Sequence, residues 1–154
     1  MLKKIIIMLA ASILLASCGS EPTQTGTSLV GTTWELVSFN RQKPIGHRAI
    51  TLSFDSSFRV SGNAGCNRYA GLVNIKGSRL HVDLSQKEFD ENKNRILTTK
   101  MYCPSPTGLM DQEQRYLEQL TNSRKFSVQG NQLIIKNGAD ALVYKPYNNN
   151  QDGK

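Results

Sequence analysis

The stretch Ile50–Ser61, "ITLSFDSSFRVS", decides the fold. Apolar and polar residues alternate along Ile50–Phe54, a pattern that is typical of a strand with one buried face. The polar turn Asp55–Ser57 is short, and the strand pattern continues in Phe58–Ser61. Two strands joined by so few residues predict an antiparallel pair.

Further strand-like runs lie on both sides of this pair. Several are separated by short turns at Gly77-Ser78, Gly130-Asn131 and Asn137-Gly138, which contain residues that tolerate the positive φ of tight hairpins. The runs are 33–39, 69–75, 80–84, 126–128, 133–135 and 142–144. Many short strands joined by tight turns predict a mainly β (α+β) fold, in which an antiparallel sheet curls on itself or forms an open barrel.

One amphipathic helix interrupts the strands. Ser105 is expected to cap its N-terminus, Pro106 suits the first helical position, and Asn122 can end it. Its apolar stripe contains Leu109, Met110, Tyr116, Leu117 and Leu120. The opposite, polar face contains Asp111, Glu113, Gln114, Arg115, Glu118 and Gln119. The stripe must be buried, and we expect the helix to pack on the sheet.

The N-terminus has the features of an export signal. Two lysines are followed by the apolar run Ile5–Leu15, which is too short to span a bilayer and is typical of a secretory signal peptide. The signal ends in Leu15-Ala16-Ser17-Cys18, which resembles the bacterial lipobox. The resemblance implies a signal peptide at residues 1–17 and a lipidated Cys18. Because Gly19, rather than an aspartate, follows Cys18, it also implies the periplasmic face of the outer membrane if the organism is Gram-negative.

The composition divides the remaining chain into three parts. Residues 18–28 are polar and rich in Gly, Ser and Thr, which predicts a lipidated flexible tether. Residues 29–146 contain the strands and the helix and form one domain by length. Residues 147–154 are polar and are expected to be a disordered tail.

The positive charge is spread along the chain. The formal net charge is +7, and loss of Lys3 and Lys4 with the signal leaves 17 Lys and Arg against 12 Asp and Glu, or +5. The cations form no continuous block and do not alternate with aromatic residues, so no nucleic-acid partner is expected. The surplus charge suits a domain held near anionic lipid.

Two cysteines remain besides Cys18. Cys66 lies in the glycine-rich stretch Ser61–Gly71 and Cys103 lies just before the helix, and an exported pair in a small domain is most simply a disulfide. A metal site would need further ligands, and His47 and His81 stand alone, so no metal is expected. A catalytic thiol with His81 as its base is the other alternative.

Together these residues resemble a known family. The motifs are Gly31–Leu36, Ser61–Gly71, Thr98–Cys103, a helix with Glu113 and Leu117, and Leu142–Pro146. They are similar to the META domain of the HslJ-like heat-shock protein family, from which Tyr102 departs because a small residue is common there. The resemblance implies a barrel-like fold with one helix, an envelope location, and links to heat shock and to tolerance of novobiocin. It implies no catalytic residues and no cofactor.

Two functions follow as hypotheses. The first is a non-enzymatic binding or structural module, anchored to the membrane, which binds an unknown envelope protein or small ligand on the sheet or at the barrel mouth. The alternative is a small envelope enzyme, a thiol exchanger or a hydrolase, that uses Cys66 or His81. Thiol-exchange enzymes usually carry closely spaced cysteines, and these two are 37 positions apart, which favours the first hypothesis.

Overall fold

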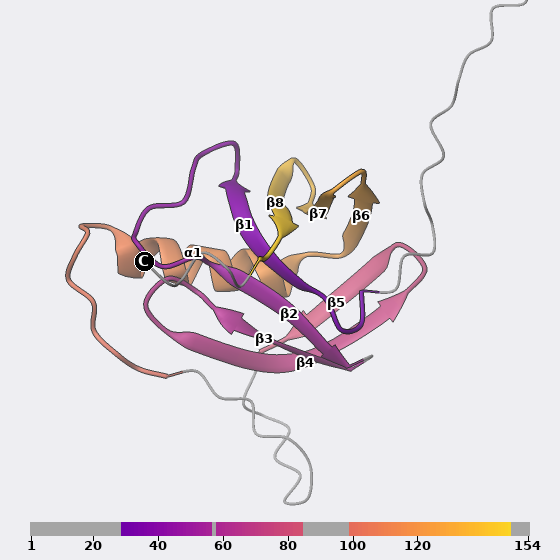
Figure 1. The fold of residues 1–154 in the computed structure, drawn as a ribbon, viewed down its shortest axis with the longest axis horizontal. Coiled ribbons are helices and arrows are strands. Elements are labelled where there is room, and N and C mark those ends of the chain that lie inside the picture. The colour runs from indigo at the N-terminus through magenta and orange to yellow at the C-terminus, as the bar shows by residue number, and fades with distance from the viewer. Residues whose placement is uncertain (1–28, 57, 85–98, 149–154) are drawn as a thin grey trace, which may run out of the picture.

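The computed structural model describes residues 29–56, 58–84 and 99–148. In this part of the chain, eight antiparallel strands form a closed barrel in which each strand pairs with its neighbours in sequence, and β1 pairs with β8 (Figure 1). The strands are β1 Thr33–Phe39, β2 Thr51–Ser56, β3 Arg59–Asn63, β4 Arg68–Lys76, β5 Arg79–Asp83, β6 Lys125–Gln129, β7 Gln132–Asn137 and β8 Asp140–Pro146. The predicted mainly β fold is confirmed, with a closed barrel where the sequence left a curled sheet or an open barrel.

The alternation of apolar residues decides which side of each strand faces the interior. Leu52, Phe54 and Val60 are fully buried, and Phe54 pairs directly with Val60 across β2 and β3. Their polar neighbours Thr51 and Ser53 are partly exposed. The hairpin that the sequence predicted at this place is therefore present. Its register is fixed by burial, because a one-residue change of register would turn its apolar residues out of the core.

The barrel has one weak seam. β5 and β6 share a single register pair, Arg79 with Lys125, whereas β4 and β5 are paired over the full length of β5. The helix α1, Leu109–Asn122, packs against β5 and β7, which lie on either side of this seam. In Figure 1, α1 lies between the group β6–β8 and the group β2–β5. The helix therefore covers the place where the sheet is least well paired.

The start of α1 differs from the prediction. The helix begins at Leu109 and is preceded by Gly108, which has φ 84° and contributes no side-chain cap. A left-handed residue stops a right-handed helix from extending backwards, so Ser105 and Pro106 lie outside it. The end is as predicted, because Asn122 is the last helical residue.

Three tyrosines meet inside the barrel. Tyr69, Tyr116 and Tyr144 come from β4, α1 and β8 and are almost fully buried. The Tyr69 hydroxyl donates to the Thr51 carbonyl at 2.8 Å, and its oxygen lies 2.8 Å from that of Tyr116, which in turn accepts from Tyr144 at 3.3 Å. Since Tyr69 has one hydroxyl proton, Tyr116 must donate to Tyr69. The hydroxyls thus form a directed chain from Tyr144 to Thr51.

Trp34 also belongs to this core. Its side chain is 6% exposed, and its Nε1 donates to the Thr32 hydroxyl at 2.7 Å. Across the described residues, no helix has both the length and the apolar character needed to cross a membrane.

Candidate functional site

The polar residues of α1 fasten the loops at one end of the barrel. Gln112, Glu113 and Gln119 are all buried, although Glu113 and Gln119 were predicted on the polar face, opposite the buried apolar stripe. That prediction is wrong because a helical-wheel pattern sorts residues by polarity alone. A polar side chain can be buried when other groups satisfy its hydrogen bonds. Loop backbone does this for Gln112, backbone together with the Asn67 amide does it for Glu113, and the Asn40 amide does it for Gln119.

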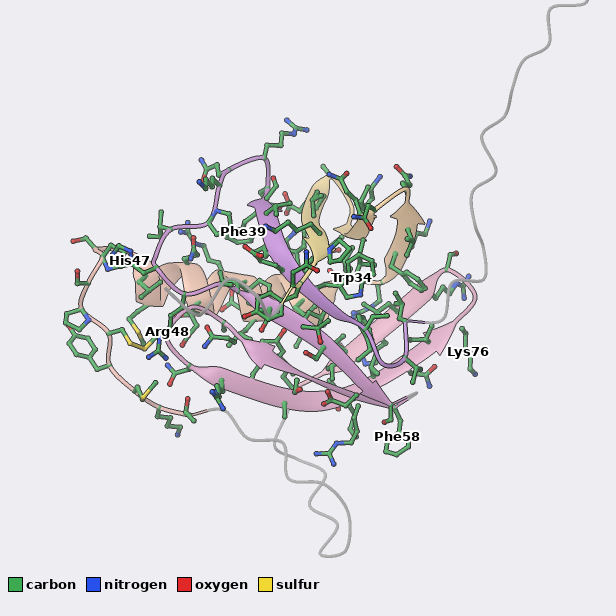
Figure 2. All side chains as sticks on the ribbon, in the orientation of Figure 1. Trp34, Phe39, His47, Arg48, Phe58 and Lys76 are labelled. Atoms are coloured by element: carbon green, nitrogen blue, oxygen red, sulfur yellow. A yellow bond between two sulfur atoms is a disulfide. The ribbon has the colours of Figure 1, made fainter. Side chains whose placement is uncertain are left out.

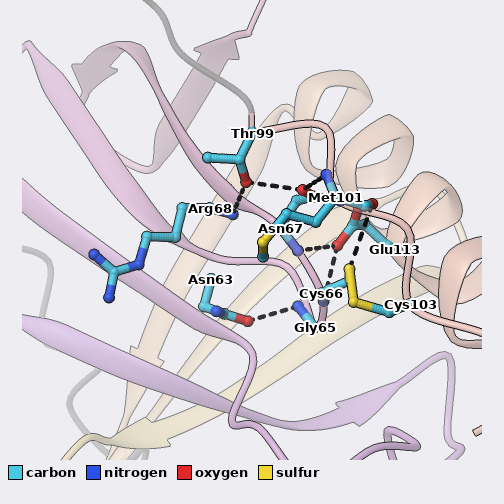
Figure 3. The surroundings of a disulfide bond; sticks show 9 residues. All are labelled: Asn63, Gly65, Cys66, Asn67, Arg68, Thr99, Met101, Cys103 and Glu113. Carbon is cyan, nitrogen blue, oxygen red and sulfur yellow. Dashed lines mark hydrogen bonds between the residues drawn. A yellow bond between two sulfur atoms is a disulfide. The ribbon is translucent and has the colours of Figure 1, made fainter. Parts of the chain in front are cut away.

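Glu113 holds the loop between β3 and β4 (Figure 3). Its Oε2 accepts hydrogen bonds from the backbone N–H groups of Cys66, at 2.9 Å, and Asn67, at 2.6 Å. Its Oε1 accepts from the Asn67 side-chain amide at 2.7 Å. Three donors therefore converge on one buried carboxylate, which fixes the conformation of this loop relative to the helix.

Asn67 extends this network to the segment before α1. Its Oδ1 accepts from the Met101 N–H at 2.7 Å and from the Thr99 hydroxyl at 2.8 Å. Its Nδ2 also donates to the Met101 carbonyl at 3.1 Å. Asn67 is 3% exposed, and its backbone N–H and both side-chain amide atoms form hydrogen bonds, so it joins three segments of the chain.

A disulfide joins the same segments covalently, as predicted. Cys66 and Cys103 are bonded, with Cα atoms 6.0 Å apart. Cys66 is 1% exposed. The bond ties the β3–β4 loop to the residues that lead into α1, next to the Glu113 carboxylate. The sequence predicted the bond but not the carboxylate beside it.

The glycines around Cys66 serve the barrel more than the disulfide. A Cβ on Gly62 would lie 2.0 Å from the Thr51 carbonyl oxygen, and one on Gly71 would lie 2.5 Å from that of Asp83. These two glycines let neighbouring strands approach closely. Gly65, with φ 122°, makes a sharp turn before Cys66.

A second loop, between β1 and β2, runs along α1. The Gln112 side chain pairs with the backbone of Ile45, accepting from its N–H at 2.8 Å and donating to its carbonyl at 3.0 Å. The Gln119 and Asn40 amides pair in the same two-bond manner, at 2.9 and 3.0 Å. The loop is therefore held on the helix at two places.

This loop borders a groove of about 710 Å³. Its basic lining residues are Arg41, Lys43, His47, Arg48 and Lys145. The acidic residue in the lining is Glu35, which forms an ion pair with Lys145 at 3.1 Å. The charge of Lys145 is thus balanced, while positive charge from the loop remains for a ligand. The groove is the candidate functional site.

The backbone at the mouth of this groove is in an uncommon conformation. Asn40 and Arg41 both have positive φ, of 48° and 68°. Asparagine tolerates this region well, but arginine adopts it rarely, so the surrounding hydrogen bonds must hold it. Asn40 supplies them, since its N–H bonds to the Ala141 carbonyl and its Oδ1 accepts from the Ala141 N–H at 3.1 Å. The backbone of Arg41 is therefore held at a fixed place on the rim, and its exposed side chain extends from there.

The other predicted residues are distributed over the molecule. His81 is exposed in β5 and lines a separate depression of about 440 Å³. It pairs with Asn74, six positions along β4 from Arg68, so about 20 Å of strand separate it from the Cys66 loop. His47 lies in the groove. No cluster of three or more potential metal ligands occurs in residues 29–56, 58–84 and 99–148, and Cys18 lies outside them.

The sequence patterns did not single out the groove, because its lysines and arginines belong to a charge that is spread along the chain and His47 is an isolated histidine. The density of cations between Arg41 and Arg48 was an available signal. No sequence pattern marked Gln112 and Gln119 as the residues that position the loop.

These observations define a class of protein, a small antiparallel barrel whose packed helix fastens the loops at one end. A family model described as the META domain matches residues 27–148, so the chain belongs to the META domain family. No curated protein matches the sequence significantly.

Two NMR structures share the fold. One is of a protein from Burkholderia xenovorans, with 23% identity and a TM-score of 0.57, and the alignment covers 77% of this chain and 83% of that one. The other is also 23% identical with a TM-score of 0.57, and covers 76% and 90% of the two chains. At this level of identity the likeness concerns the fold alone.

Proposed function

We propose that this chain is an exported envelope protein, anchored to the membrane through lipid on Cys18, whose META domain binds an anionic partner without catalysing a reaction. The observation that carries the binding role is the groove beside the β1–β2 loop. It is large enough for a peptide segment or a small ligand, its cations outnumber its acids, and α1 holds its rim in place.

Carboxylate groups suit this groove best among common anions. Arg41 and Arg48 carry guanidinium groups, which bind carboxylates through paired hydrogen bonds. Ile45 is 41% exposed between them and offers an apolar contact. An acidic segment of an envelope protein, with an apolar residue near its carboxylates, would satisfy both features.

A non-catalytic role is supported by the state of the candidate catalytic residues. The Cys66 sulfur is bonded to Cys103 and buried, and His81 lies far along the barrel from it. A thiol exchanger or hydrolase that uses Cys66 or His81 remains the alternative. Counting free thiols in the purified full chain would separate the two, since the alternative needs a free Cys66 thiol or turnover that depends on His81.

The groove is tested by titrating the full chain with a fluorescent Glu-rich peptide and following anisotropy. Arg41→Glu combined with Arg48→Glu should weaken binding by at least tenfold, because it reverses charges that face the ligand. Arg68→Glu with Lys100→Glu is the matched control, since both side chains are exposed and neither lines the groove. If both double variants lose binding equally, the binding depends on the net charge of the protein and the groove is not the binding site.

The anchor is tested separately. Cys18→Ala should leave the chain without fatty acid, as judged by mass spectrometry, and should shift it out of the membrane fraction. A variant that still carries fatty acid would refute the assignment of Cys18.

The physiological part of the proposal concerns stress. The resemblance to HslJ-like proteins supports a role in heat-shock response or in tolerance of novobiocin. A strain lacking the protein should then grow less well at raised temperature or with the drug, and the Arg41→Glu and Arg48→Glu variant should fail to restore growth. Restoration by that variant would separate the stress role from the groove.

A further inference from the structure

A second basic surface lies at the opposite end of the barrel from the groove. Its centre is the depression of about 440 Å³, lined by Asn74, Lys76, Arg79, Leu80, His81, Arg124 and Lys125. Lys76, Arg79, Arg124 and Lys125 are all exposed, and no acidic residue lines the depression. We call the surface formed by these four cations, together with Val30 and Phe58, the proximal face.

The described chain begins beside the proximal face. The N–H of Gly31 bonds to the Phe54 carbonyl at 2.7 Å, which places Val30 next to the β2–β3 turn. Phe58 lies in that turn, and its carbonyl accepts from the Val73 N–H at 2.9 Å. Lys76 follows Val73 by three residues, or about 10 Å of strand. Figure 2 shows Phe58 and Lys76 at one end of the molecule and His47 and Arg48 at the other.

The proximal face also contains exposed apolar side chains. Val30 is 45% exposed and Phe58 is 53% exposed, and both lie at the β2–β3 turn. Basic residues around projecting apolar residues are characteristic of surfaces that lie on anionic bilayers, where cations bind phosphates and the apolar groups enter the interface. Asp55, at the end of β2, is an exposed acid nearby and is outnumbered by the four cations.

We propose that the proximal face rests on an anionic phospholipid surface, with Phe58 in the interface and the groove directed away from it. The proposal rests on the proposed anchor at Cys18, because a tether of residues 18–28 would hold this end of the domain near the membrane. Lipid phosphates would occupy the depression, and the groove would face partners in the compartment.

Phe58→Trp provides a direct probe. The chain contains one natural tryptophan, Trp34, which is buried and supplies a constant background. The mature full chain would be reconstituted into phosphatidylcholine vesicles with and without phosphatidylglycerol, both with brominated acyl chains. Bromine quenches an indole within the interface, so the added emission should be quenched in the anionic vesicles and much less in the neutral ones.

Charge reversal tests the role of the cations. Lys76→Glu with Arg79→Glu should lower the population in contact with the bilayer by about fivefold for each lost cation, or about 25-fold together, and restore the emission. Arg68→Glu with Lys100→Glu is the control of equal charge change at the other end of β4, and it should leave the quenching intact.

Three outcomes would overturn the proposal: equal quenching in neutral and anionic vesicles, equal loss in both double variants, and release of the quenching by millimolar inorganic phosphate alone. The last would show a site for free anions rather than a membrane surface. Mass spectrometry of the same preparation reports the lipid on Cys18, so failure of the anchor is distinguished from failure of the membrane contact.

Discussion

At the scale of single residues, the most informative side chain is one that a polarity pattern assigns to the surface. Glu113 is 5% exposed and accepts three hydrogen bonds from the Cys66–Asn67 segment. Cys66 and Asn67 are themselves buried, and a buried donor without an acceptor costs about 1–3 kcal/mol.

Glu113→Gln should therefore destabilise the protein by about 2–4 kcal/mol, because the amide nitrogen cannot accept a hydrogen bond and the remaining oxygen has lost its charge. Urea unfolding of the full chain measures this loss. Glu118→Gln is the control, since Glu118 lies on the exposed side of the same helix and accepts from Gln114. If the urea midpoint of Glu113→Gln changes as little as that of the control, the hydrogen-bond network contributes little to stability.

The direction of the tyrosine chain gives a second prediction. Tyr116→Phe removes the acceptor of the Tyr144 hydroxyl proton, leaving a buried donor unpaired, and should cost about 1–3 kcal/mol. Tyr144→Phe removes only a donor at the start of the chain, so it should cost less. Thermal unfolding of both variants tests the order, and a reversed order would mean that the hydroxyls point the other way.

At the scale of elements, alternation and turn residues were sufficient to predict the strands. All eight predicted runs are strands, because each needs only a local pattern of buried and exposed residues, as in Ile50–Phe54. The predicted start of the helix was wrong. Ser105 and Pro106 fit a general rule for helix termini, but the left-handed Gly108 makes the helix begin three residues later.

The loops and the closure of the barrel were beyond local reasoning. The position of the β1–β2 loop depends on Gln112 and Gln119, which are 67 and 79 residues from their partners Ile45 and Asn40. A single sequence does not show which distant backbone groups a buried amide will bond. The pairing of β1 with β8, and hence a closed barrel, depends on the same kind of long-range contact.

The disulfide also acts on elements, since it joins the β3–β4 loop to the approach to α1. Cys66→Ser with Cys103→Ser releases a constraint over 37 residues, for which the chain-entropy model gives roughly 4 kcal/mol. The melting temperature should fall accordingly, while binding of the Glu-rich peptide at a temperature where the variant is folded should be unchanged. Loss of binding by the folded variant would show that the bond also shapes the groove.

At the scale of the whole molecule, the buried tyrosines link stability to alkaline pH. Burial raises the pKa of Tyr116 to about 12, and raises the pKa values of Tyr69 and Tyr144 well above 10. The unfolded chain loses these protons from about pH 10, whereas the folded chain keeps them, so this stabilisation is complete below pH 10 and declines above it. The stability lost through Tyr116 alone should reach about 2 kcal/mol by pH 12.

Melting temperature measured from pH 9 to 12, together with tyrosinate absorbance at 295 nm, checks this prediction. The absorbance of the buried tyrosines should rise only with unfolding. Full ionisation near pH 10 in a chain that is still folded would contradict their burial. Tyr116→Phe should show a shallower decline because it removes one of the three groups.

The pairing of the first strand with the last has a consequence for biosynthesis. Trp34 lies opposite Pro146, so the barrel cannot close until β8 has been made, although β1 is among the first parts of the domain to leave the ribosome. Long-range pairing of this kind slows folding, because the intervening chain must be ordered first. During translation β1 has an unpaired edge for almost the whole time that the domain is being synthesised. A chain cut short before Ala141 would keep that edge, with its exposed backbone N–H and C=O groups, and we expect it to aggregate or be degraded rather than accumulate.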